Sequence, residues 1–133
     1  MSWEINQNDS SGHKRKILVV DDEPNVRKLL RTLLRDYTVV EAEDGEKAVE
    51  IAGAEKPDLI LMDIMMPKMD GYSSCYVLKR EPATRSIPII IVTAIDLKLN
   101  LELGKEIGAD GYITKPFNSQ DLLNSISQVL ATA

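Results

Sequence analysis

Residues Asp58–Gly71 read DLILMDIMMPKMDG, and this stretch decides the fold. The apolar run Leu59–Met62 is followed directly by one carboxylate, Asp63. A proline turn then leads to Asp70-Gly71. An apolar run of this length between turn signals is typical of a strand that is buried on both faces. Because ligands bind at the carboxyl ends of strands in open α/β sheets, we expect Asp63 to lie at a functional sheet edge.

Strand and helix patterns alternate on both sides of this stretch. Short apolar runs predict five strands, at residues 17–20, 38–40, 59–62, 89–92 and 112–114. Residues at helical spacing predict helices that begin near Pro24, Gly45, Gly71 and Asn118 or Ser119, with Asp22 or Glu23 available to cap the first.

Residues 97–103 form the least clear segment. Their apolar residues alternate with period two, which favours a strand on pattern alone. Their place between two parallel strands requires a crossover, which is normally helical. We therefore predict a helix here, so that five strands and five helices form βαβ units with a parallel sheet.

Length, charge and cysteine content indicate one globular domain. A chain of 133 residues suits a single core, and its net charge of -5 argues against nonspecific binding of nucleic acid. No run approaches the length of a membrane span, and the N-terminus lacks the apolar core of a signal peptide. The single cysteine, Cys75, suits a reducing compartment, so we expect a cytoplasmic protein. The polar residues 1–14 are expected to be flexible, and residues 15–133 to form the domain.

Polar groups follow four of the five predicted strands: Asp21-Asp22, then Asp63, Thr93 and Lys115. Each alone has an ordinary interpretation as a cap, a turn residue or a solvated charge. In a flavodoxin-like strand order, 2-1-3-4-5, the three carboxylates would converge on one cleft, with a hydroxyl and an ammonium on its other side.

Such a cleft favours a metal ion and a phosphoryl group. Clustered carboxylates repel one another, and a hard cation such as Mg²⁺ relieves that repulsion. The ammonium of Lys115 attracts phosphoryl oxygens, and a carboxylate can accept a phosphoryl group as an acyl phosphate.

Four motifs together resemble the receiver domain of two-component response regulators, of the kind found in chemotaxis regulators. They are ILVVDDEP (17–24), DLILMDIMMPKMDG (58–71), IPIIIVTA (87–94) and GADGYITKPF (108–117). The resemblance covers about residues 15 to 131. It implies a doubly wound, three-layer α/β sandwich with a five-stranded parallel sheet.

The resemblance also implies a role for each site residue. Asp63 matches the phosphoacceptor aspartate, and Asp22 and Asp63 match direct Mg²⁺ ligands. Asp21 would act on the metal mainly through water, and the backbone carbonyl of Met65 would be the remaining protein ligand.

The remaining matched residues concern the phosphoryl oxygens and the conformational switch. Lys115 should pair with the phosphoryl oxygens, and Thr93 should move to hydrogen-bond one of them. Tyr112 occupies the switch aromatic position, and the Lys115-Pro116 peptide bond is expected to be cis.

By this resemblance, a sensor histidine kinase or a phosphotransfer protein transfers a phosphoryl group to Asp63. The switch then reshapes the face formed by the helix at 97–103, the strand at 112–114 and the final helix, and a partner or output domain reads this face. The chain would be no enzyme on other substrates, since it would catalyse only its own phosphorylation and dephosphorylation. We expect this domain to bind neither nucleic acid nor membranes.

Two interpretations of residues 97–103 stay open. Leu99, Leu101 and Leu103 stand where relatives often place charged or small residues. They predict either a poorly amphipathic helix or an apolar patch for a homodimer or another partner.

Two other classes of protein fit the sequence less well. A Mg²⁺-dependent phosphohydrolase would place an acidic residue two positions after its nucleophile, where this chain has Met65. A pseudo-receiver would lack a member of the acidic, Thr and Lys set, which is complete here.

Overall fold

A computed structural model describes residues 13–64, 71–93 and 108–132. Its strands are β1 (Lys16–Val20), β2 (Thr38–Ala42), β3 (Leu59–Asp63), β4 (Ile89–Thr93) and β5 (Gly111–Thr114). All four neighbouring pairs are parallel, and the strand order is β2-β1-β3-β4-β5. The predicted flavodoxin-like order is therefore confirmed.

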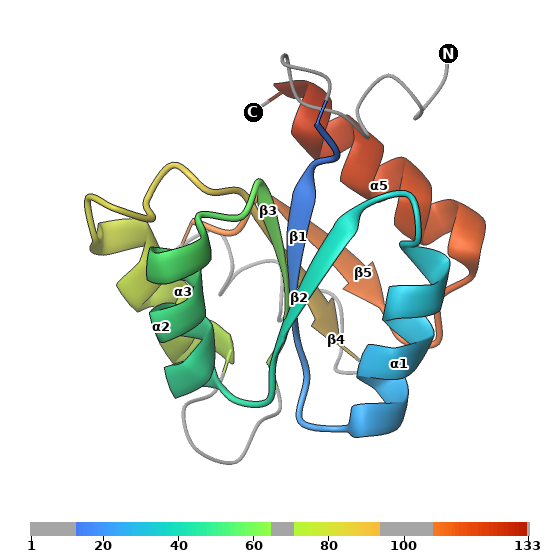
Figure 1. The fold of residues 1–133 in the computed structure, drawn as a ribbon, viewed down its shortest axis with the longest axis horizontal. Helices are drawn as coiled ribbons and strands as arrows, with labels where there is room; N and C mark the ends of the chain where they lie inside the picture. The colour runs from blue at the N-terminus through green and yellow to red at the C-terminus, as the bar shows by residue number, and fades with distance from the viewer. Residues whose placement is uncertain (1–12, 65–70, 94–107, 133) are drawn as a thin grey trace.

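Helices cover both faces of this sheet, as Figure 1 shows. α1 (Pro24–Leu33) and α5 (Ser119–Thr132) lie on one face, and α2 (Gly45–Glu55) and α3 (Gly71–Arg80) lie on the other. The helix predicted at 97–103 and residues 1–12 of the predicted flexible segment lie outside the described residues. None of the described helices is long and apolar enough to cross a membrane.

The strands alternate their side chains between two apolar layers. Ile17, Val19, Leu59 and Leu61 pack with α1 and α5, whereas their neighbours along the strands face α2 and α3. Those neighbours include Leu18, Val20, Ile60 and Met62, and all eight side chains are buried. This explains why the strands read as continuous apolar runs. Truncation of one such leucine to alanine is expected to cost about 2–5 kcal/mol.

Helix starts follow the predicted residues, with one difference in how a start is capped. Asp44 accepts a hydrogen bond from the Lys47 amide at the start of α2. Pro24 begins α1 after Glu23, but the Glu23 side chain makes no capping hydrogen bond. The carboxylate of Asp21 accepts the Glu23 amide instead, so the first acid after β1 orders the turn into α1.

The end of β3 and the start of α3 are in direct backbone contact. The Gly71 amide donates to the carbonyl of Ile64 at 3.2 Å. A Cβ on Gly71 would lie 2.5 Å from the Asp63 carbonyl oxygen and 2.6 Å from the Ile64 Cα. Only glycine fits this approach, which sets Asp63 against the first turn of α3.

Candidate functional site

Asp21 lies at the carboxyl edge of the sheet and is bonded through both its side chain and its backbone. Its side chain is nearly inaccessible, and its two carboxylate oxygens accept from the Glu23 amide at 2.9 Å and from Lys115 Nζ at 3.1 Å. Its backbone amide donates to the Ala42 carbonyl, and its carbonyl accepts from Arg27 Nη1 at 2.7 Å. Side chain and backbone are thus held from four directions.

Lys115 joins the ends of three strands. It follows β5, and its ammonium lies 3.1 Å from Asp21 after β1 and 3.8 Å from Asp63 at the end of β3. The sequence predicted this convergence, because the carboxyl ends of parallel strands share one edge. The Lys115-Pro116 peptide bond that follows is cis.

Both Asp21 and Asp63 affect the pKa of Lys115. Burial lowers the pKa of its ammonium, but the Asp63 carboxylate and the hydrogen bond and charge of Asp21 outweigh that effect. The pKa of Lys115 therefore lies above its ordinary value of 10.5, and the side chain is cationic at physiological pH. A fixed cation beside two buried carboxylates suits an added anionic group.

The three consecutive acids after β1 form a group that suits a hard cation. One carboxylate oxygen from each of Asp21, Asp22 and Glu23 lies within 4.8 Å of the others. Asp22 and Glu23 are exposed, whereas Asp21 is buried. All donors are carboxylate oxygens, which Mg²⁺ prefers over nitrogen or sulfur ligands. The donor set therefore fits Mg²⁺.

Glu23 was not predicted as a site residue, since its sequence position after Asp22 indicated a helix cap. The run of three acids was the available signal. Because the Glu23 side chain does no capping, its carboxylate stays beside those of the two aspartates.

Two further predicted site residues are Met65 and Thr93. Met65 lies outside the described residues. The backbone of Thr93 ends β4 and pairs with Thr114, one strand away from Asp63.

Tyr112 lies on β5, opposite Ile91, and packs against the apolar layer that faces α2 and α3. Its hydroxyl is buried and has no hydrogen-bond partner within the described part of the chain. Burial, with smaller contributions from Tyr72 and Cys75, raises the pKa of Tyr112 to about 12. The aromatic ring thus points inward, toward the α3 side of the sheet.

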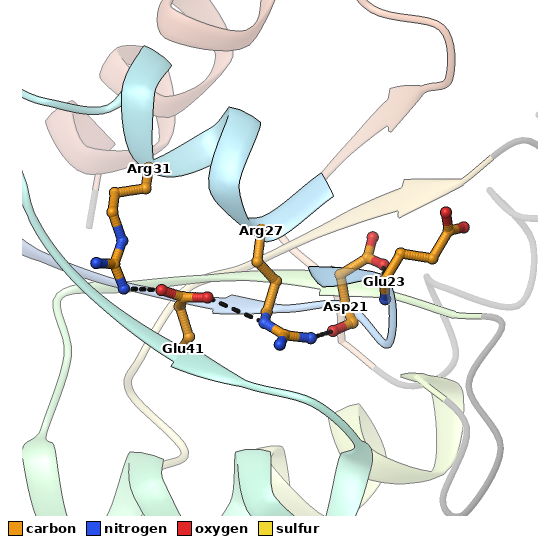
Figure 2. Close-up of polar contacts among 5 residues, drawn as sticks. All are labelled: Asp21, Glu23, Arg27, Arg31 and Glu41. Atoms are coloured by element: carbon orange, nitrogen blue, oxygen red, sulfur yellow. Dashed lines mark hydrogen bonds and ion pairs between the residues drawn. The ribbon is translucent and has the colours of Figure 1, made fainter. Parts of the chain in front are cut away.

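Two arginines of α1, Arg27 and Arg31, contact Glu41 of β2 next to the loop that carries Asp21. Figure 2 shows Arg27 of α1 between the Asp21 carbonyl and Glu41 of β2. Arg31, one turn further along α1, pairs with the same Glu41 carboxylate. In the sequence Arg27 and Arg31 look like surface charges of an amphipathic helix, and no local pattern distinguishes them.

Comparison with known proteins finds similar regulatory proteins. A "Probable transcriptional regulator ycf27" from Porphyridium aerugineum is 44% identical over 119 residues, which are 88% of this chain and 48% of the relative. The chain spans about half the length of the curated relatives it matches first.

Two solved structures of similar size superpose on most of the chain. Chemotaxis protein CheY4 of Vibrio cholerae has a TM-score of 0.82 at 32% identity, covering 86% of this chain and 98% of CheY4. The receiver domain of sensor histidine kinase PA1611 from Pseudomonas aeruginosa has a TM-score of 0.81 at 32% identity, covering 88% of this chain and 98% of that domain. The latter structure has a magnesium ion coordinated in its active site cleft.

The fold therefore agrees with that of these two solved structures. Residues 17–127 match the model of the response regulator receiver domain. The chain belongs to this family of phosphoacceptor signalling domains.

Proposed function

We propose that Asp63 accepts a phosphoryl group from a phosphohistidine of a sensor histidine kinase or a phosphotransfer protein, in a Mg²⁺-dependent reaction. The observation that carries the proposal is the position of Lys115, whose ammonium lies within 4 Å of both Asp21 and Asp63. A cation at this place neutralises charge where an acidic edge would otherwise repel a phosphate.

In the proposed reaction, a carboxylate oxygen of Asp63 attacks the phosphorus. The new O–P bond forms an acyl phosphate while the N–P bond of the phosphohistidine breaks, and the imidazole keeps that electron pair. Lys115 would shift its hydrogen bond from Asp21 toward the arriving phosphoryl oxygens. Thr93 would donate its hydroxyl to another of them.

Asp21, Asp22, Asp63 and the backbone carbonyl of Met65 would hold the Mg²⁺, with Glu23 beside them. When bound, the metal supplies positive charge that offsets the carboxylates and the phosphoryl oxygens. The presence of magnesium in the receiver domain of PA1611 supports this assignment.

The signal would leave through the face formed by β5, α5 and the predicted helix at 97–103. The phosphoryl group adds a charge of about -1.5 to -2, which draws in Thr93 and Lys115 and changes the packing of Tyr112. We expect a partner or an output domain to read this face in the cytoplasm.

The same face is the proposed surface for a homodimer. Light scattering with and without beryllofluoride tests this, because the fluoride complex mimics the phosphoryl group. A monomer in both states would argue against self-association through this face.

Mass spectrometry of the intact chain tests the proposed reaction. Incubation with acetyl phosphate and Mg²⁺ should add one phosphoryl mass to the wild type and none to Asp63→Asn, which keeps the shape of the side chain but is a poor nucleophile. Chelation of Mg²⁺ should suppress the adduct. An adduct of equal yield in Asp63→Asn would contradict the assignment of the acceptor.

A further inference from the structure

Arg27 makes two charge-assisted contacts, one with the loop after β1 and one with Glu41 on β2. Its Nη1 donates to the Asp21 carbonyl at 2.7 Å, and its Nε donates to Glu41 Oε1 at 3.0 Å. The Arg27 side chain is only 16% exposed and that of Glu41 only 23%, so solvent screens the pair weakly. We name Arg27 and Glu41 the Arg27–Glu41 clamp.

The carbonyl that Arg27 holds belongs to the peptide group between Asp21 and Asp22. A peptide group is planar, so fixing the direction of its carbonyl also fixes the direction in which the chain leaves toward Asp22. The Asp21 amide is fixed separately by the Ala42 carbonyl. Arg27 therefore restrains rotation of the Asp21–Asp22 peptide plane, together with the Asp21 carboxylate that accepts the Glu23 amide.

Glu41 lies on the edge strand β2, and one of its carboxylate oxygens accepts a hydrogen bond from Arg27 and fixes that side chain. Arg31 pairs with the other carboxylate oxygen of Glu41 (Figure 2). Glu41 also neutralises the Arg27 guanidinium, whose positive charge would otherwise weaken cation binding at the neighbouring acids. The clamp therefore combines geometric restraint of the acidic loop with compensation of the arginine charge.

We propose that the Arg27–Glu41 clamp positions Asp22 for Mg²⁺ binding, so that Arg27 is a positioning residue for the metal site. The inference rests on the proposed function, because it assigns Mg²⁺ to the acids after β1. Residues that orient metal ligands from outside the ligand shell typically contribute 10–100-fold to metal affinity.

Isothermal titration of the full chain with Mg²⁺ tests the clamp, because a positioning role and a pure charge effect predict opposite changes in Mg²⁺ affinity. If Arg27 acts by position, Arg27→Gln weakens Mg²⁺ binding by about tenfold. If Arg27 acts only through its charge, removing a cation near the site strengthens Mg²⁺ binding. Arg27→Lys keeps the charge, but one ammonium replaces the two-sided fork, so it should restore only part of the affinity.

Arg31→Gln is the matched control. It removes an arginine charge from the same Glu41 carboxylate, but Arg31 is 62% exposed and, within the described part of the chain, makes no hydrogen bond or ion pair with Asp21. Its Mg²⁺ affinity should stay within twofold of the wild type. Thermal unfolding of each variant, measured in a chelator, separates a structural effect from a metal effect.

The outcomes are distinct. Unchanged or tighter Mg²⁺ binding by Arg27→Gln, with or without a lower unfolding temperature, would overturn the positioning role and leave the proposed function intact. An equal loss in Arg31→Gln would also overturn it. Absence of Mg²⁺ binding by the wild-type chain would contradict the proposed function itself.

Discussion

Lys115 shows how one side chain can serve both stability and function. Its ammonium forms ion pairs with both Asp21 and Asp63, whose carboxylates are buried. Burial of two neighbouring carboxylates is unfavourable unless a cation compensates them. The ammonium that would pair with the phosphoryl oxygens therefore also stabilises the site before the phosphoryl group arrives.

Replacement of Lys115 by glutamine should lower the free energy of unfolding by about 2 kcal/mol at pH 7 in a chelator, because both buried acids lose a charged partner. Urea unfolding followed by circular dichroism measures the change. Lys47→Gln is the control, since Lys47 and Glu50 form an exposed pair expected to contribute less than about 1 kcal/mol. Equal effects of the two substitutions would contradict the account of Lys115.

Tyr37 predicts a pH dependence of stability at alkaline pH. Its hydroxyl is buried without a hydrogen-bond partner in the described residues, and burial raises its pKa from 10.0 to about 12. The unfolded phenol loses its proton first as the pH rises, so the folded state holds more protons between these two values. Stability should therefore fall from about pH 10 to about pH 12.

Tyr37→Phe should remove this part of the alkaline loss and raise stability at neutral pH by about 1 kcal/mol, since it deletes an unsatisfied buried group. Urea unfolding at pH 8 and pH 11 makes the comparison. Tyr76→Phe serves as a control because Tyr76 is exposed. A Tyr37→Phe variant that loses stability between the two pH values as steeply as the wild type would contradict the prediction.

At the scale of secondary-structure elements, the close approach of β3 and α3 determines where Asp63 lies. The Gly71 amide bonds to Ile64, and there is no space for a side chain between Gly71 and the Asp63 carbonyl. The glycine thus acts on the site through packing of two elements and not through chemistry of its own.

Gly71→Ala should destabilise the chain by about 1–3 kcal/mol, because the added Cβ meets backbone that must shift. Gly53→Ala is the matched control: Gly53 lies within α2 with nothing near its Cβ position, so alanine should stabilise by about 0.5–1 kcal/mol. Thermal unfolding compares both variants. The two changes should have opposite signs, and destabilisation by both would contradict this interpretation.

Strands β2 and β5 extend beyond the residues that the sequence predicts for them. The sequence predicts a second strand over residues 38–40, yet β2 continues through Glu41 to Ala42. Arg27 and Arg31 compensate the Glu41 charge, which makes that extension acceptable. β5 likewise begins at Gly111, a residue unusual in strands, where a Cβ would lie 3.4 Å from Ile90.

At the scale of the whole molecule, the parallel sheet follows from the alternation of apolar runs and helical patterns. This alternation also brings the ends of β1, β3 and β5 to one edge, so the candidate site could be predicted from Asp21, Asp63 and Lys115. The partners of Lys115 could not, because its hydrogen bond to Asp21 joins residues 94 positions apart. The Arg27–Glu41 clamp depends on side-chain reach between two elements, which periodicity does not encode.

The account depends most on Asp63, and not one of the three clustered acids after β1, being the phosphoacceptor. Borohydride reduces an acyl phosphate to an alcohol but leaves a free carboxylate unchanged, so it marks the acceptor within the sequence. After incubation with acetyl phosphate and Mg²⁺, borohydride reduction and peptide mass spectrometry should find homoserine at position 63 and unchanged residues at Asp21, Asp22 and Glu23. A reduced side chain at one of those three positions, with Asp63 unchanged, would contradict the account.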